Sequence, residues 1–136
     1  MKASGTFSVA LQPQPLWEGA ANSGLGRLSI DKQFQGELEA TSQGEMLSSR
    51  GAEGSAGYVA LEKVTGILNG REGSFVLQHS GTMTRGEGTL SVTVVPDSGR
   101  DELEGLEGKM SIEVEGKEHR YSFDYSITTP LASESG

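Results

Sequence analysis

The sequence predicts an all-β domain: an eight-stranded antiparallel barrel, closed on itself, with its strands in mostly up-and-down order. Glycine accounts for 20 of the 136 residues, about twice its usual share of ~7%. Apolar and polar residues alternate in many short stretches, which is the pattern of half-buried strands, and no helical periodicity exceeds about two turns. Short strands with glycine-marked turns indicate a meander, and closing the meander removes its exposed edges.

Eight segments carry this alternation, and most of their ends are marked by glycine, proline or small polar residues. Successive side chains of a strand point to opposite faces, and in most segments one face is more apolar than the other. The expected strands cover residues 6–11, 25–33, 34–45, 56–66, 74–79, 89–95, 106–115 and 118–127.

In the N-terminal half, the first strand has Phe7, Val9 and Leu11 on one face and ends before two prolines. The second strand carries Leu28 and Ile30 between polar neighbours. The third alternates apolar and small residues with acidic or polar ones. All three therefore fit strands with one buried face.

In the C-terminal half, the fourth strand is apolar on both faces over residues 58–61. Asn69 and Gly70 follow it and predict a tight hairpin turn into the fifth strand. The last strand places Tyr121 and Tyr125 on one face. Turns rich in glycine, proline and aspartate bound the strands between them.

The chain length suits one domain, with a core over about residues 5–127 and a flexible tail over residues 128–136. A two-sheet sandwich is the alternative architecture. We favour the barrel because glycines within strands relieve crowding where a small sheet bends sharply. Such glycines stand in or beside the expected strands at positions 36, 44, 57, 73 and 108.

The composition excludes several classes of protein. Cysteine is absent, which excludes disulfide scaffolds, cysteine zinc sites and iron–sulfur clusters. The net charge of -8 speaks against nucleic-acid binding, which needs a basic surface. The longest apolar run is Tyr58–Leu61, whereas a membrane helix needs about 20 apolar residues. We expect a cytoplasmic protein without a secretory signal, without membrane contact and without a cofactor.

Several stretches of the chain resemble a bacterial family of small domains of unknown function. They span roughly residues 5–127, and the segment over residues 71–79 is the most specific. The matching stretches are Gly44–Leu47, Gly57–Glu62, Gly70–His79, Val94–Gly99 and His119–Tyr125. The resemblance implies an eight-stranded barrel similar to that of allene oxide cyclase, within a broader lipocalin-like group. It implies no established activity, and no motif matches the cyclase's own site, so no catalytic residue is carried over.

Glu62 is the first of two candidate catalytic residues. If Tyr58 and its alternating neighbours face inward, Glu62 lies in an apolar lumen, where burial would raise its pKa and suit it to acid–base chemistry. If Val59 and Leu61 face inward instead, Glu62 is solvated, because a shift of one residue exchanges the two faces.

His79 is the second candidate, as an acid, base or ligand at the rim of the lumen if Phe75 points inward. The alternative is a hydrogen-bonded histidine that closes the end of its strand. His119, the other histidine, could meet it at one barrel mouth, and a carboxylate from Glu62 or Glu45 would complete a metal triad. The chain lacks paired-histidine motifs, so we expect no metal.

Three functions remain open: lumen binding of a small apolar or amphipathic molecule, cyclase- or isomerase-type catalysis, and a filled barrel acting as a structural or interaction subunit. A lumen packed solid by Phe7, Leu38, Phe75 and Phe123 would favour the third. Both faces are apolar over residues 58–61 and 75–77, whereas a small barrel needs one apolar side, and this surplus predicts a homo-oligomer. The expected ligand-binding residues are Tyr58, Glu62, Gln78, His79, His119 and Tyr121.

Overall fold

The computed structural model describes residues 1–20 and 22–128, so the expected tail lies outside the described residues from residue 129 on. The described part of the chain contains nine β-strands and no helix. They are β1 (Lys2–Pro13), β2 (Leu25–Gly36), β3 (Leu38–Arg50), β4 (Ala56–Leu68), β5 (Arg71–Thr84), β6 (Glu87–Val94), β7 (Arg100–Asp101), β8 (Leu106–Glu115) and β9 (Glu118–Ile127).

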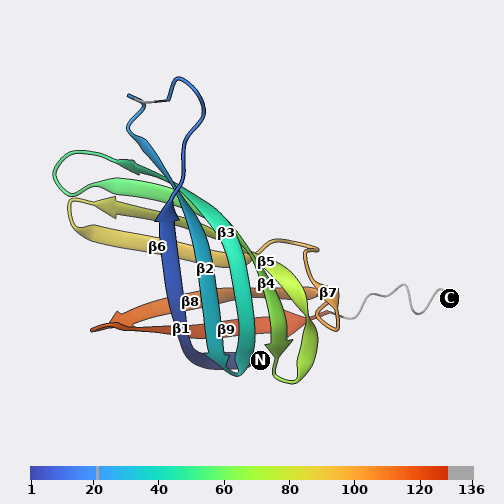
Figure 1. Cartoon of the computed structure of the whole chain (residues 1–136). Coiled ribbons are helices and arrows are strands. Elements are labelled where there is room, and N and C mark those ends of the chain that lie inside the picture. The colour runs from blue at the N-terminus through green and yellow to red at the C-terminus, as the bar shows by residue number, and fades with distance from the viewer. Residues whose placement is uncertain (21, 129–136) are drawn as a thin grey trace.

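Eight of the nine strands form a closed antiparallel ring, and the expected barrel is confirmed (Figure 1). Around the ring, β1 to β6 pair in chain order, β6 meets β8, β8 pairs with β9, and β9 pairs with β1. The short β7 pairs with β5 outside this ring. Closure leaves an inner and an outer surface, which is the distinction on which the candidate residues depend.

The expected strand boundary at Phe34 is wrong. Phe34 lies within β2, directly opposite Phe7 of β1, and the turn into β3 follows at Gly36. Gly36 has a φ of 112°, a conformation that residues with a Cβ rarely adopt. A Cβ there would lie 2.6 Å from the Ser4 carbonyl oxygen, so the close approach to β1 also requires glycine.

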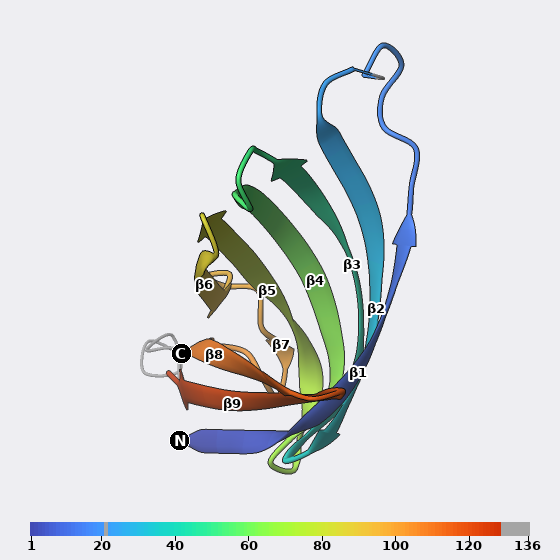
Figure 2. The same cartoon turned by 90° about the vertical axis from the view of Figure 1, so that its left-hand side faces the viewer.

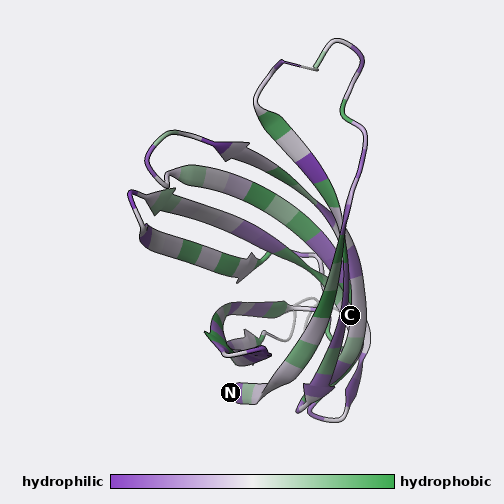
Figure 3. Cartoon of the chain, turned by 60° about the vertical axis from the view of Figure 1, so that its left-hand side comes forward, coloured by the Kyte–Doolittle hydropathy of each residue, from purple (hydrophilic) through white to green (hydrophobic). Residues whose placement is uncertain are grey.

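The alternation predicted for the strands is visible along the ribbons (Figure 3). Side chains from all eight ring strands fill the lumen in the half of the barrel where β8 and β9 complete the ring. Large apolar side chains with almost no exposure include Phe34, Leu38, Leu68, Phe75, Leu77 and Phe123. This half of the barrel is therefore a packed core.

The ring is fully paired at one end only. β1 pairs with β9 from Lys2 to Phe7, and β6 meets β8 only at Thr93 and Lys109. Figure 2 shows β2 to β5 continuing as a curved sheet past the level of β8 and β9. We call this open end the mouth. There the Arg85 N–H donates to Ser55 Oγ at 3.1 Å and joins the β5–β6 connection to the β3–β4 connection.

The opposite end is sealed by two turns. The Asn69 N–H, between β4 and β5, donates to the Glu37 carbonyl, between β2 and β3, at 2.8 Å. The Asn69 side-chain amide also donates to the Tyr125 hydroxyl at 2.7 Å. The lumen thus opens toward the mouth, and a molecule from solvent can enter it there.

Candidate functional site

A buried polar cluster lies between the packed core and the mouth. Its centre is the Glu62 carboxylate of β4, which points into the barrel with 1% of the residue exposed. Lys32 Nζ donates to Glu62 Oε1 at 3.0 Å, and Ser42 Oγ donates to Oε2 at 2.5 Å. His79 Nε2 lies 2.6 Å from Oε1, so the ring donates to the carboxylate when Nε2 carries its proton.

Strand register brings these four side chains together. Lys32 of β2 lies opposite Ser42 of β3, and Gly44 lies opposite Glu62 of β4. Residues opposite each other in neighbouring strands share a face. Gly44 leaves room for the carboxylate, since a Cβ there would lie 2.8 Å from the Cβ of Glu62. Of the two orientations left open for Glu62, the structure shows the inward one. Two of its contacts, Lys32 and Ser42, come from strands that the sequence did not connect with it.

The expectation of a raised Glu62 pKa is wrong. Burial by itself raises the pKa, but the His79 hydrogen bond, the Lys32 charge and the Ser42 hydrogen bond together lower it to about 2. These partners favour the ionised form by more than desolvation disfavours it. Glu62 is therefore a carboxylate at neutral pH, and it is not poised to donate a proton.

The cluster is closed to solvent. The Glu62 side chain is 0% exposed, that of His79 5% and that of Lys32 7%. The Lys32 ammonium also lies 4.9 Å from the centre of the Phe7 ring and 5.8 Å from that of Phe34. Every buried side-chain nitrogen or oxygen in the described part of the chain has a hydrogen-bond partner. The cluster holds charge inside the barrel and presents no free reactive atom to the lumen.

Above this cluster, the mouth contains a hollow of about 470 Å³. Leu28 and Met46 line it, and both stand in the same cross-strand row as His79. Nearer the rim, Met83 and Leu90 line it and are 41% and 45% exposed. His79 thus lies at the level of the hollow's floor, and the walls above it are mostly apolar.

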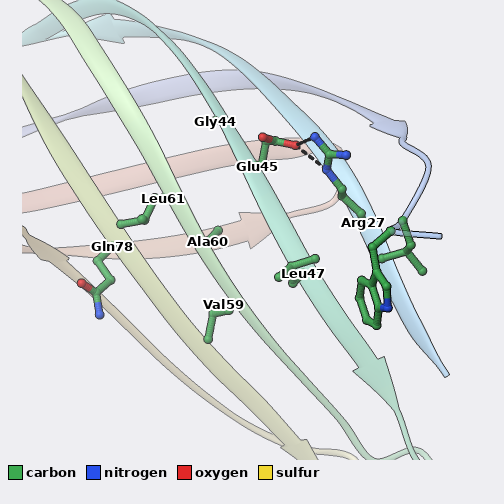
Figure 4. Close-up of a pocket in the computed structure, with 10 residues that line it drawn as sticks. Arg27, Gly44, Glu45, Leu47, Val59, Ala60, Leu61 and Gln78 are labelled. Carbon is green, nitrogen blue, oxygen red and sulfur yellow. Dashed lines mark hydrogen bonds and ion pairs between the residues drawn. The ribbon is translucent and has the colours of Figure 1, made fainter. Parts of the chain in front are cut away.

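A second hollow, of about 800 Å³, lies on the outer face of the barrel (Figure 4). The exposed apolar residues Leu47, Val59 and Leu61 line it, together with Trp17 of the β1–β2 connection. Arg27 and Glu45 form an ion pair at its edge. We call this surface the outer patch.

Two expected site residues belong to the outer patch. Gln78 is exposed there and does not enter the lumen, because strand residues alternate and its neighbours Leu77 and His79 point inward. Glu45 lies outside for the same reason and pairs with Arg27. The expectations that Gln78 lines the lumen and that Glu45 could join a metal triad are therefore corrected.

Tyr121 is buried at the sealed end, away from the mouth. Its hydroxyl accepts a hydrogen bond from the Leu38 N–H at 2.9 Å and lies 3.0 Å from the Gln35 carbonyl, to which it donates. His119 packs against Phe7, with ring centres 5.2 Å apart. Neither residue joins the Glu62 cluster.

Of the six expected ligand-binding residues, Tyr58 lines the mouth hollow. Its ring covers Gly81 of β5, where a Cβ would lie 2.5 Å from Tyr58 Cε1. His79 was expected at the rim but is buried at 4% exposure, and Gly81 and Met83 of the same strand lie between it and the end of the barrel.

The described residues show neither a group of metal ligands nor a membrane-spanning helix. Within residues 1–20 and 22–128, no three histidine, cysteine or acidic side chains are grouped as metal ligands would be. The same residues contain no helix long and apolar enough to cross a membrane.

The sequence interpretation missed four polar residues on the inner face: Lys32 and Ser42 in the buried cluster, and Ser48 and Arg50 at the mouth. One signal was present, because Lys32 follows Leu28 and Ile30 at alternating positions and so shares their buried face. A lysine there needs a buried partner.

Comparison with known proteins identifies relatives without an assigned activity. The family described as "Protein of unknown function (DUF3224)" matches residues 3–125. A solved structure of a DUF3224 protein of unknown function from Shewanella oneidensis MR-1 is 50% identical, covers 96% of this chain and 98% of its own, and superposes with a TM-score of 0.89. Among curated proteins, none matches the chain.

Proposed function

Because the chain belongs to the DUF3224 family, whose function is unknown, we propose a function from the geometry of its barrel: the mouth binds a small apolar or amphipathic molecule. The observation that carries this proposal is the hollow of about 470 Å³ on the inner face. Its volume is in the range of small-molecule pockets, which are concave and mostly apolar.

The exposure of the inner face supports binding. Met83 and Leu90 point toward the lumen but are 41% and 45% exposed. Removing apolar surface from water contributes about 25 cal/mol per Å². A ligand that covers these side chains therefore gains free energy without any rearrangement of the barrel.

The mouth is a better candidate than the larger outer hollow. Five strands, β2 to β6, contribute residues to its lining and surround it from several sides. The outer hollow lies on the convex face of β3 to β5, and Leu16 and Trp17 of the β1–β2 connection line part of it. A concave site removes more of a small ligand's surface from contact with solvent.

Catalysis of the cyclase or isomerase type is the second candidate function, with Glu62 and His79 as the acid–base pair. Their 2.6 Å contact favours it, whereas the closed surroundings and the lowered pKa of Glu62 favour a structural role. A relation to the allene oxide cyclase and lipocalin-like barrels is part of this proposal. Turnover that survives Glu62→Gln would exclude Glu62 as the catalytic group.

The third candidate is an interaction subunit that assembles with a second copy of itself through the outer patch. Phe7, Leu38, Phe75 and Phe123 do fill the closed half of the barrel. The patch is apolar, and Arg27 and Glu45 neutralise each other at its edge, although the whole chain carries a charge of -8. Two copies can approach there without charge repulsion. A monomer mass in light scattering would exclude this assembly. We retain a cytoplasmic location as part of these proposals.

Fluorescence titration with Nile red, a neutral apolar dye, tests mouth binding. Leu90 on the inner face and Leu47 on the outer patch are each 45% exposed, so they form a matched pair. Leu90→Asn should weaken dye binding about tenfold, since a buried leucine contributes roughly 1.5 kcal/mol or more, whereas Leu47→Asn should not. No binding by the wild type, or equal loss in both variants, would exclude the mouth as the site.

A further inference from the structure

Three polar side chains at the mouth have no partner among the described residues. Ser48 and Arg50 of β3 and Tyr58 of β4 line the hollow. None of the three side chains takes part in the hydrogen bonds or ion pairs found within residues 1–20 and 22–128. Unlike the buried Glu62 cluster, which is saturated, these groups remain available to a ligand.

Their positions converge on one part of the inner face. Ser48 lies directly opposite Tyr58 in the register of β3 and β4, which places their Cβ atoms about 5 Å apart. Arg50 follows Ser48 at the next position on the same face, opposite Ala56. Gly81 beneath the Tyr58 ring holds that ring against β5. Two hydroxyls and a guanidinium therefore line one wall of the hollow.

The charges of the inner face distinguish this wall from the rest of the lumen. Among the described residues that line the hollow, Arg50 is the charged one. The deeper charges, Lys32 and Glu62, are paired with each other. Burial raises the pKa of Tyr58, so its hydroxyl keeps its proton at neutral pH and can donate it in a hydrogen bond.

We propose that the ligand of the mouth is an organic anion: its charged oxygen-bearing head group binds Arg50, Tyr58 and Ser48, and its apolar body covers Leu28, Met46 and Leu90. This inference rests on the proposed binding function and adds the chemical class and the orientation of the ligand. Arginine binds a carboxylate with two parallel hydrogen bonds. The head group stays at the rim, so it keeps part of its hydration, and the ionised Glu62 lies deeper in the barrel, away from it.

Isothermal titration calorimetry with two matched probes tests the inference. Naphthoate and naphthamide have the same apolar body and differ in the charge of the head group. We expect the wild-type protein to bind naphthoate roughly tenfold more tightly, which corresponds to one charge-assisted hydrogen bond. Added salt should weaken naphthoate binding and leave naphthamide binding unchanged.

Single-residue variants then test which side chains bind the charged head group. Arg50→Gln should weaken naphthoate binding about tenfold, to the level of naphthamide, while naphthamide binding stays unchanged. Arg71→Gln is the control, since it removes the same charge at the start of β5, opposite Leu68 and away from the hollow. Tyr58→Phe, which removes one hydroxyl, should weaken naphthoate binding about threefold.

The outcomes separate the two proposals. If Nile red and both naphthyl probes fail to bind, the mouth is not a binding site and both proposals fall. If the probes bind equally well and Arg50→Gln binds like the wild type, mouth binding stands and the anionic head group is excluded. Equal losses in Arg50→Gln and Arg71→Gln would also overturn the inference, because they would show only a general effect of net charge.

Discussion

The Glu62 carboxylate and the His79 imidazole lie 2.6 Å apart inside the barrel, between Oε1 and Nε2. They belong to neighbouring strands, where His79 is opposite Ala60 and Glu62 is opposite Leu77, so the contact runs diagonally between two rows. Lys32 approaches the same oxygen from β2 at 3.0 Å. A buried carboxylate with these partners is stabilised in its ionised form, and stability should therefore depend on the cluster.

The free energy of unfolding should fall at acid pH because of Glu62. Its pKa is about 2 in the folded protein, against 4.5 ordinarily. A lowered folded-state pKa adds stability that is complete above the unfolded value and is lost as pH falls from about 4.5 toward about 2. The loss attributable to Glu62 is about 3 kcal/mol, and urea unfolding as a function of pH measures it.

The other carboxylates of the chain titrate in the same range, so the comparison must be made with Glu62→Gln. In that variant the free energy of unfolding should fall by about 3 kcal/mol less than in the wild type between pH ~5 and pH ~2. Curves that run parallel would show that the Glu62 pKa is not lowered on folding.

Lys32 and Glu62 should be coupled in a double-mutant cycle. Either Lys32→Met or Glu62→Gln leaves the other charge buried without its partner, which costs about 3 kcal/mol of unfolding free energy. The double variant should cost less than the sum by about 1–3 kcal/mol, since no lone charge remains. Chemical denaturation measures all four proteins, and purely additive costs would mean that the 3.0 Å ion pair contributes no coupling.

Gly44→Ala should destabilise the barrel more than Gly57→Ala. A Cβ at Gly44 would collide with the Leu61 carbonyl oxygen and lie 2.8 Å from the Cβ of Glu62, whereas the nearest atom at Gly57 is 3.8 Å away. Overpacking against backbone costs about 2 kcal/mol, and the change at Gly57 should stay within about 0.5 kcal/mol. Equal midpoints in thermal unfolding would contradict the close packing at Gly44.

Tyr121→Phe should destabilise the protein, whereas Tyr58→Phe should not. The Tyr121 hydroxyl accepts from the Leu38 N–H at 2.9 Å at the sealed end, so its removal leaves a buried donor unpaired at a cost of about 1–3 kcal/mol. The Tyr58 hydroxyl has no partner within the described residues and should contribute less than about 0.5 kcal/mol. Urea unfolding of the two variants provides the comparison.

Much of the barrel could be predicted because its signals are local. The alternation of Tyr58, Ala60 and Glu62 identified one face of β4, and glycine-containing turns identified most strand ends. The boundary at Phe34 failed because β2 and the start of β3 form one continuous alternating stretch. Only the positive φ of Gly36 and its approach to β1 mark the turn.

The site was less predictable because its residues come from separate strands. Glu62 and His79 were identified as candidates, but Lys32 and Ser42 were not, and these two help to reverse the direction of the Glu62 pKa shift. Gln78 was placed in the lumen although its own neighbours, Leu77 and His79, require the outer face. That error was avoidable from the period of two alone.

The sequence by itself determined that this chain forms strands, where most of them turn, and which residues of each strand share a face, because these properties depend on neighbours within a few positions. Only the tertiary structure decided which face is inside and which side chains meet there. That outcome depends on cross-strand register around the closed ring, which brings Lys32, Ser42, Glu62 and His79 together from four strands. It also depends on the limited pairing of β1 with β9 and of β6 with β8, which leaves one end of the barrel open.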